Sequence, residues 1–291
     1  MILLLPLLSF LTGYFLVEYL KKLRPVMAMI LAKILIPLII IYHMVFYQQG
    51  SIWLMIFSFS VSLGLFVFIF ILFRDRLIAL CSSYLNMAWL GFPFAFAIFG
   101  ADASSPMVTL YIGGSVFGNV CAVMALSKEK QSVGAIVKKL IFSPPILALL
   151  IAAILSFWNL SGFQDLSIIQ AVYVLDKWLM TFIGMCILGM WLSKIKIQFV
   201  DLIQSFKLAI LKLGLGLICC AIAYFILPIP ASVTLFGIML MFFLLPPAAN
   251  IVALETHYSG TGVSAQYIAA GTIISCMMIG IFAMIYHGLV R

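Results

Sequence analysis

Apolar runs of membrane-spanning length follow one another along the chain, separated by short polar connections. A run of about 17 to 25 mainly apolar residues can cross a bilayer as one helix. The pattern predicts ten such helices in two sets of five. The first set is Ile2–Leu20, Met27–Tyr47, Ile52–Phe73, Leu77–Phe99 and Pro106–Leu126. The second set is Leu140–Trp158, Ala171–Leu192, Lys207–Leu227, Ser232–Leu254 and Gly262–Gly288.

Two of these runs, the fourth and the ninth, contain helix-breaking residues in their middles. The breakers and the polar residues beside them are Asn86, Gly91 and Pro93 in the fourth run, and Pro246, Pro247 and Asn250 in the ninth. Irregular backbone at membrane depth is tolerated where it is buried in protein or lines a cavity. A matched pair of interrupted runs in two halves of a chain points to the substrate site of a secondary transporter.

The composition agrees with lipid as the solvent. Of the residues, 66% are hydrophobic and 8% are charged, whereas soluble domains are about half apolar and about a quarter charged. The formal net charge is +8, but the basic residues lie between the apolar runs. We therefore assign them to membrane orientation and not to a nucleic-acid partner, and we expect an all-α polytopic membrane protein with the lipid bilayer around it.

The basic residues concentrate in alternate connections, those that follow the first, third, fifth and seventh runs. They are Lys21, Lys22, Arg24, Arg74, Arg76, Lys128, Lys130, Lys138, Lys139, Lys194 and Lys196. Since cytoplasmic loops carry the excess of Lys and Arg, these connections are predicted to lie in the cytoplasm. In a cell (inner or plasma) membrane, both termini would then be extracytoplasmic.

The basic connection Ser127–Lys139 separates five runs from five. Five is odd, so two similar halves must cross the membrane in opposite directions. We predict a first inverted repeat over residues 1–133 and a second over residues 134–291, with the broken runs as equivalent fourth helices.

The two breaks suggest an anion site. Proline removes a backbone donor, so each broken run should form two half-helices, the second starting near Pro93 or Pro246. The first amides of a helix lack partners within it and favour an anion. A carboxamide adds neutral donors, so the predicted organic-anion site is Asn86, Gly91, Pro93, Pro246, Pro247 and Asn250. The alternative is a pair of kinked helices in which the asparagines bond freed backbone groups.

Four further side chains are candidates for cavity or gating charges. Lys33 and Lys212 lie inside their runs, where a central charge is expensive and suggests function. Glu255 and His257 follow the ninth run and could form a gate or a proton relay. Other polar groups, including His43 and Asp176, fall near predicted helix ends, where snorkelling accounts for most of them.

The sequence offers little support for an enzyme or for a metal site. The six cysteines lie inside apolar runs without a CxxC pair, and neither an HExxH motif nor a DDxxD run is present. We therefore expect no cofactor, no metal and no catalytic residues. A sodium/proton antiporter would be expected to carry Asp at the crossing, and neither break has an Asp within seven residues. A sodium-coupled organic-anion symporter of the bile-acid type stays open, as do H⁺ or Na⁺ coupling and a homodimer.

The broken runs resemble the auxin efflux carrier family of permeases, which includes plant PIN proteins and bacterial members. The similar pieces are Asn86, Gly91, Phe92, Pro93 and Gly100, and then Pro246, Pro247, Ala248, Asn250 and Tyr258. The resemblance implies inverted repeats whose fourth and ninth helices cross at their prolines, and scaffold and transport subdomains interleaved across both repeats. It implies alternating-access transport of organic anions such as indole acetate, malate or malonate. The long central loop of the plant members is absent here.

Overall fold

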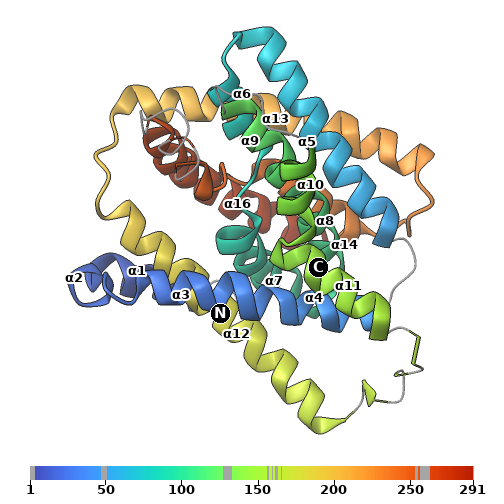
Figure 1. Ribbon diagram of the computed structural model, residues 1–291. Coiled ribbons are helices and arrows are strands. Elements are labelled where there is room, and N and C mark those ends of the chain that lie inside the picture. The colour runs from blue at the N-terminus through green and yellow to red at the C-terminus, as the bar shows by residue number, and fades with distance from the viewer. Residues whose placement is uncertain are drawn as a thin grey trace.

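The computed structural model describes residues 4–46, 51–126, 133–155, 157–158, 160, 163–164, 166–252, 255 and 263–290, and its regular elements are helices (Figure 1). The first half contains α1 (Leu4–Phe15), α2 (Val17–Leu20), α3 (Arg24–Ile30), η1 (Leu31–Leu35), α4 (Ile36–Val45), α5 (Ser51–Phe73), α6 (Arg76–Ser83), η2 (Met87–Gly91), α7 (Phe92–Phe99), η3 (Gly100–Ala103), α8 (Ser104–Phe117), η4 (Gly118–Ala122) and α9 (Val123–Leu126). Of the η elements, η1, η2 and η4 are π-helical turns and η3 is a 3₁₀ turn.

The second half includes three long helices, α12, α13 and α16, together with shorter ones. Its helices are α10 (Val133–Ile141), α11 (Pro144–Leu155), α12 (Ser167–Leu192), α13 (Phe199–Ile226), α14 (Val233–Leu244) and α16 (Ser264–Val290), with residues 250–252 also helical. Residues 133–139, which the sequence assigns to the connection between the halves, are helical, because α10 begins at Val133. Its apolar positions recur at helical spacing around Lys138 and Lys139, which makes it an amphipathic helix.

Within the described residues, six helical stretches are long and apolar enough to cross a membrane: Arg24–Val45, Ile52–Phe73, Met87–Ala122, Ser167–Leu192, Phe199–Ile226 and Ser264–Gly288. Shorter apolar helices are Leu4–Phe15, Pro144–Leu155 and Val233–Leu244. The stretch Met87–Ala122 bends at Gly100, whose φ of 68° suits a residue without a side chain. These helices confirm the expectation of an all-α membrane protein.

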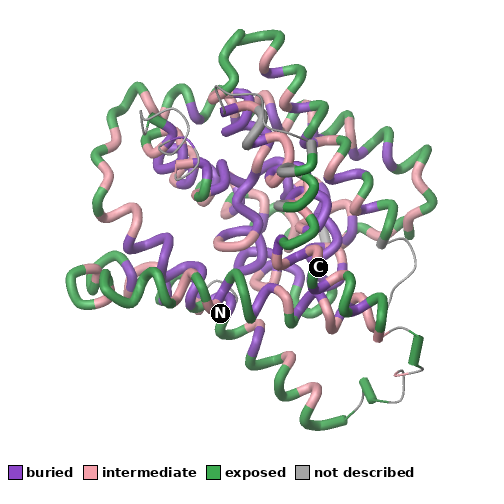
Figure 2. Tube along the Cα trace, in the orientation of Figure 1, coloured by how far each residue is buried: buried purple, intermediate pink, exposed green. Residues whose placement is uncertain are grey.

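The outer faces of the long helices are apolar and exposed, while the core lies where the helices meet (Figure 2). Ile71 and Leu72 on α5, Phe225 and Ile226 on α13, and Met284 on α16 are all more than half exposed. A water-soluble monomer rarely presents apolar surface on this scale. Lipid is the solvent that suits these faces.

The helices pack in two groups. In one group α1 lies along α12, and α4 packs against α11 and α12. In the other group α5 packs against α6 and α8, while α13 packs against α14 and α16. The groups meet where α12 contacts η2 and α7, and where α4 contacts α8. The broken segments therefore lie beside the boundary between the two groups.

Candidate functional site

The two interrupted runs meet at their breaks. In the first, α6 ends at Ser83, Tyr84 is extended (φ −94°, ψ 102°), and helix resumes at Met87. In the second, α14 ends at Leu244 and Leu245 is extended (φ −67°, ψ 146°). Leu85 and Pro247 form an antiparallel bridge between the two extended pieces. The family resemblance implied that these two runs cross, and their extended pieces do lie side by side.

Hydrogen bonds between the two extended pieces pair backbone groups that the interrupted helices leave without partners. The amide of Asn86 donates to the carbonyl of Pro246 at 2.8 Å, and the amide of Ala248 donates to the carbonyl of Tyr84 at 2.8 Å. Proline holds the preceding residue in extended conformation, so Leu245 and Pro246 are shaped for this pairing. Away from water, each unpaired backbone group would cost several kcal/mol. Here each broken segment supplies the carbonyl that accepts a hydrogen bond from an amide of the other segment.

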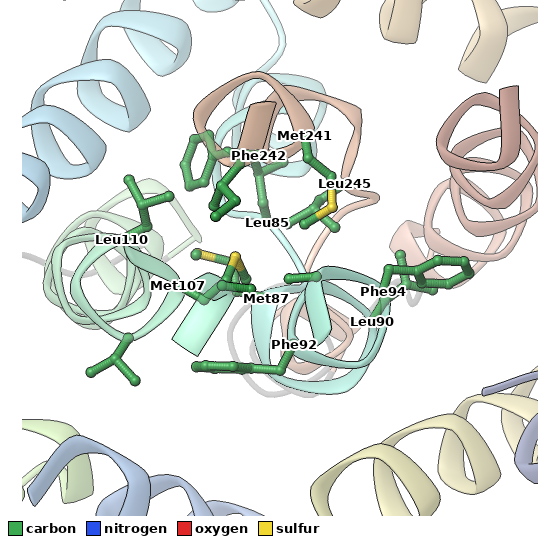
Figure 3. Close-up of a cluster of buried hydrophobic side chains, with 14 of the residues drawn as sticks. Leu85, Met87, Leu90, Phe92, Phe94, Met107, Leu110, Met241, Phe242 and Leu245 are labelled. Carbon is green, nitrogen blue, oxygen red and sulfur yellow. The ribbon is translucent and has the colours of Figure 1, made fainter. Parts of the chain in front are cut away.

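Apolar packing surrounds this polar exchange. Figure 3 shows Leu85, Met87 and Leu245 near the centre of a cluster of buried side chains. Gly91 belongs to the same packing, because a Cβ there would stand 3.1 Å from both the Leu245 Cδ1 and the Met107 Cε atoms. Gly91 therefore allows η2 to lie close beneath the second broken segment.

Pro93 does not lie at the break, and the prediction that a half-helix begins there is wrong. The break falls at Tyr84–Asn86, and η2 continues into α7 without interruption. A proline in a helix removes one backbone bond and crowds the carbonyl four residues earlier. The wider π-turn of η2, just before Pro93, absorbs both effects. Pro93 lines a different cavity, between α1, α7 and α12.

The two asparagines lie on one side of the crossing with different partners. Asn86 is 4% exposed, and its Oδ1 accepts from the amide of Trp89 at 3.2 Å, so it caps the second half-helix. Its buried Nδ2 has no hydrogen-bond partner among the described residues. Asn250 is exposed and donates through Nδ2 to the hydroxyl of Tyr84 at 2.8 Å. The N-cap preference of Asn is the sequence signal that could have located the first break.

Both asparagines line one cavity of about 170 Å³ beside the crossing. Its other walls come from the two broken segments, from η1 and α4, and from α8. The other lining residues are Ala32, Ile36, Tyr84, Leu85, Met87, Ala88, Trp89, Tyr111, Gly114, Ser115, Ala248 and Ala249. The lining is mainly apolar with a few polar groups, which is the usual composition of a small-molecule site.

Lys212 reaches the crossing from α13. Its side chain is buried, and Nζ donates to the carbonyl of Leu245 at 2.7 Å. It lines a smaller cavity of about 30 Å³ together with Pro246 and Pro247. A charge at the bilayer centre costs about 2.5–3.5 kcal/mol on insertion scales, and the carbonyl at the end of α14 offsets part of this.

Neither Lys33 nor Glu255 lines the asparagine-lined cavity. Lys33 is exposed on η1 and is absent from the lining of that cavity. Glu255 is buried and accepts from the amides of Val263 and Ser264 and from the Ser264 hydroxyl, so it holds the beginning of α16. His257 lies outside the described residues.

Sequence reasoning underrated a polar region at the far ends of α4, α12 and α14. A cavity of about 460 Å³ there is lined by Tyr42, His43, Asp102, Tyr173 and Thr234, among others. His43 Nε2 is buried without a hydrogen-bond partner in the described part of the chain, and so are both carboxylate oxygens of Asp176 on α12. Their burial depends on how α4 meets α12, which no local sequence pattern reveals.

No site for a metal emerges from the side chains that are described, since no three His, Cys, Asp or Glu residues among them gather in one place. The chain matches no protein-family model, and no curated protein matches it at a significant level.

Proposed function

We propose that the protein is a permease that carries a small organic anion across the membrane by alternating access. The carboxylate would bind beside the crossing, in the cavity lined by Asn86 and Asn250. The single observation that carries the proposal is the antiparallel bridge between Leu85 and Pro247, which joins two broken helices beside a cavity. Discontinuous helices of this kind form the substrate sites of secondary transporters.

The pairing of helices supports ten membrane helices in two inverted repeats. In such a repeat α5, α6 and α8 would correspond to α13, α14 and α16. The contact of α5 with α6 then matches that of α13 with α14, and the contact of α5 with α8 matches that of α13 with α16. The contact of α1 with α12 likewise matches that of α11 with α4. A two-fold relation between the halves, as the auxin efflux carrier resemblance implies, would produce this correspondence.

The chemistry of the cavity favours a carboxylate. Asn86 Nδ2 is a buried donor without a described partner, and it lies at the N-terminal end of the helix that follows, where Asn86 Oδ1 already caps the amide of Trp89. Asn250 opens the corresponding helix of the second break. These donors and the positive ends of both half-helices would attract an anion without needing a charged side chain.

The two packing groups supply the parts that alternating access requires. The group of α1, α4, α11 and α12 would act as scaffold, and the group that carries the crossing would move against it. The cavity of about 460 Å³ at the ends of α4, α12 and α14 would be one of the two entrances. From the charge pattern, it would face the extracytoplasmic side.

Uptake into proteoliposomes tests this proposal. Purified protein should accumulate at least one radiolabelled acid among malate, malonate and indole acetate. Asn86→Ala and Asn250→Ala should each reduce uptake about tenfold or more, because a hydrogen bond to a charged group contributes about 1.5–3 kcal/mol. Ser60→Ala, on the exposed face of α5, is the matched control and should transport like the wild type. Normal uptake by both asparagine variants would overturn the proposed site.

A further inference from the structure

Lys212 is a buried lysine whose Nζ contacts a backbone carbonyl of the crossing. It projects from the middle of α13, is 5% exposed, and donates to the Leu245 carbonyl at 2.7 Å. The salt bridges found among the described residues both involve Glu18, far from this position. A carbonyl at a helix end, and not a carboxylate, therefore holds the ammonium.

The surroundings of the ammonium have the composition of a cation site. Leu245 caps the C-terminal end of α14, where the helix dipole is negative. The same small cavity is lined by Ser82, Ser205 and Ser275, whose hydroxyls can act as oxygen ligands. In transporters with broken helices, unwound carbonyls and half-helix C-termini bind the coupling Na⁺ or H⁺. Here the Nζ atom of Lys212 lies against such a carbonyl.

We propose that the Lys212 ammonium is the resident cation of the crossing, in the place that a coupling Na⁺ takes in a sodium-driven carrier. The inference rests on the proposed function and deepens it. The positive charge that stabilises the end of α14 belongs to the chain, so transport of the organic anion does not require Na⁺. On this proposal the protein would not be the sodium-coupled symporter that the sequence left open.

The test compares sodium chloride with choline chloride for the wild type, Lys212→Ala and the control Lys207→Ala. Lys207 lies on the same helix but is exposed. The first readout is the melting temperature of purified protein in detergent, which requires no transported substrate. Lys212→Ala should melt below the wild type in choline, and Na⁺ should raise its melting temperature by entering the vacated space. Na⁺ should leave the wild type and Lys207→Ala unchanged.

Uptake of the labelled acid in the same two salts is the second readout. Wild-type uptake should be equal in sodium and choline, and Lys212→Met should reduce it by about an order of magnitude, because a half-helix end loses its counter-charge. An Na⁺-dependent wild-type melting temperature or uptake would overturn the inference, and so would Na⁺-indifferent melting of Lys212→Ala. These wild-type measurements decide even if a variant fails to fold. Absence of any uptake would instead count against the proposed function, while the melting experiment would still test the resident cation.

Discussion

At the scale of single residues, the crossing depends on a few side chains and on glycines that let them approach. Tyr84 illustrates this: its carbonyl accepts from Ala248, its hydroxyl accepts from Asn250, and its ring lies against Gly118. A Cβ built on Gly118 would stand 2.2 Å from the Tyr84 ring. The absence of a side chain at Gly118 therefore positions the tyrosine that holds Asn250.

Gly118→Ala is expected to lower the stability of the protein and to weaken anion binding. The Tyr84 ring must shift, and overpacking of this kind costs about 1–3 kcal/mol. Gly64→Ala is the control, because a Cβ at Gly64 on α5 meets nothing within 4 Å. Melting temperatures in detergent compare the two. An unchanged melting temperature for Gly118→Ala would contradict the role assigned to this contact.

Sequence reasoning placed Asn86 and Asn250 in one site, and both line one cavity. The prediction of a break at Pro93 failed, because a proline can cause either a break or a π-turn in a helix. The residue type alone does not distinguish the two outcomes. Sequence reasoning also missed the burial of Asp176, which follows from packing between helices distant in sequence. Residue type indicated which groups could bind an anion, but tertiary contacts decided which of them do come together.

At the scale of elements, a π-turn precedes two of the prolines, Pro37 and Pro93. The π-turn η1 precedes Pro37 at the start of α4, just as η2 precedes Pro93 at the start of α7. In both places the helix continues past the proline. Pro246 and Pro247 act differently, because two successive missing donors force an extended segment between α14 and the helical residues 250–252.

This difference predicts opposite outcomes for two similar substitutions. Pro93→Ala should leave uptake within about twofold of the wild type, because it only restores an amide to a continuous helix. Pro247→Ala should reduce uptake strongly, because the added amide points away from the Leu85 bridge and an unpaired buried donor costs about 1–3 kcal/mol. The measurement is initial uptake rate in proteoliposomes. Equal loss in both variants would show that the fourth helix depends on Pro93 after all.

At the scale of the whole molecule, two features of the architecture were accessible from hydropathy and charge. They are the long apolar helices and the matched positions of the two breaks, whereas the meeting of the breaks was implied by the resemblance to auxin efflux carriers. The division into two packing groups was not accessible from hydropathy and charge, because it depends on which helix faces lie together. An ion pair between Glu18 in α2 and Lys194 after α12 also places two of the basic connections side by side.

That arrangement predicts the orientation of the chain. A reporter fused after Lys196 should lie in the cytoplasm, so green fluorescent protein should fluoresce there and alkaline phosphatase should be inactive. At the C-terminus the two reporters should behave in the opposite way, since basic connections stay in the cytoplasm. Fluorescence at both positions would contradict an even number of spans with extracytoplasmic ends.

The central claim is that an organic anion binds where the two broken helices cross, between Asn86 and Asn250. Equilibrium binding of the transported radiolabelled acid to purified protein tests it most directly, because binding is separate from the movement of domains. We predict that Asn86→Ala and Asn250→Ala each weaken binding about tenfold or more, while Ser60→Ala binds like the wild type. Wild-type affinity in both asparagine variants would contradict the account.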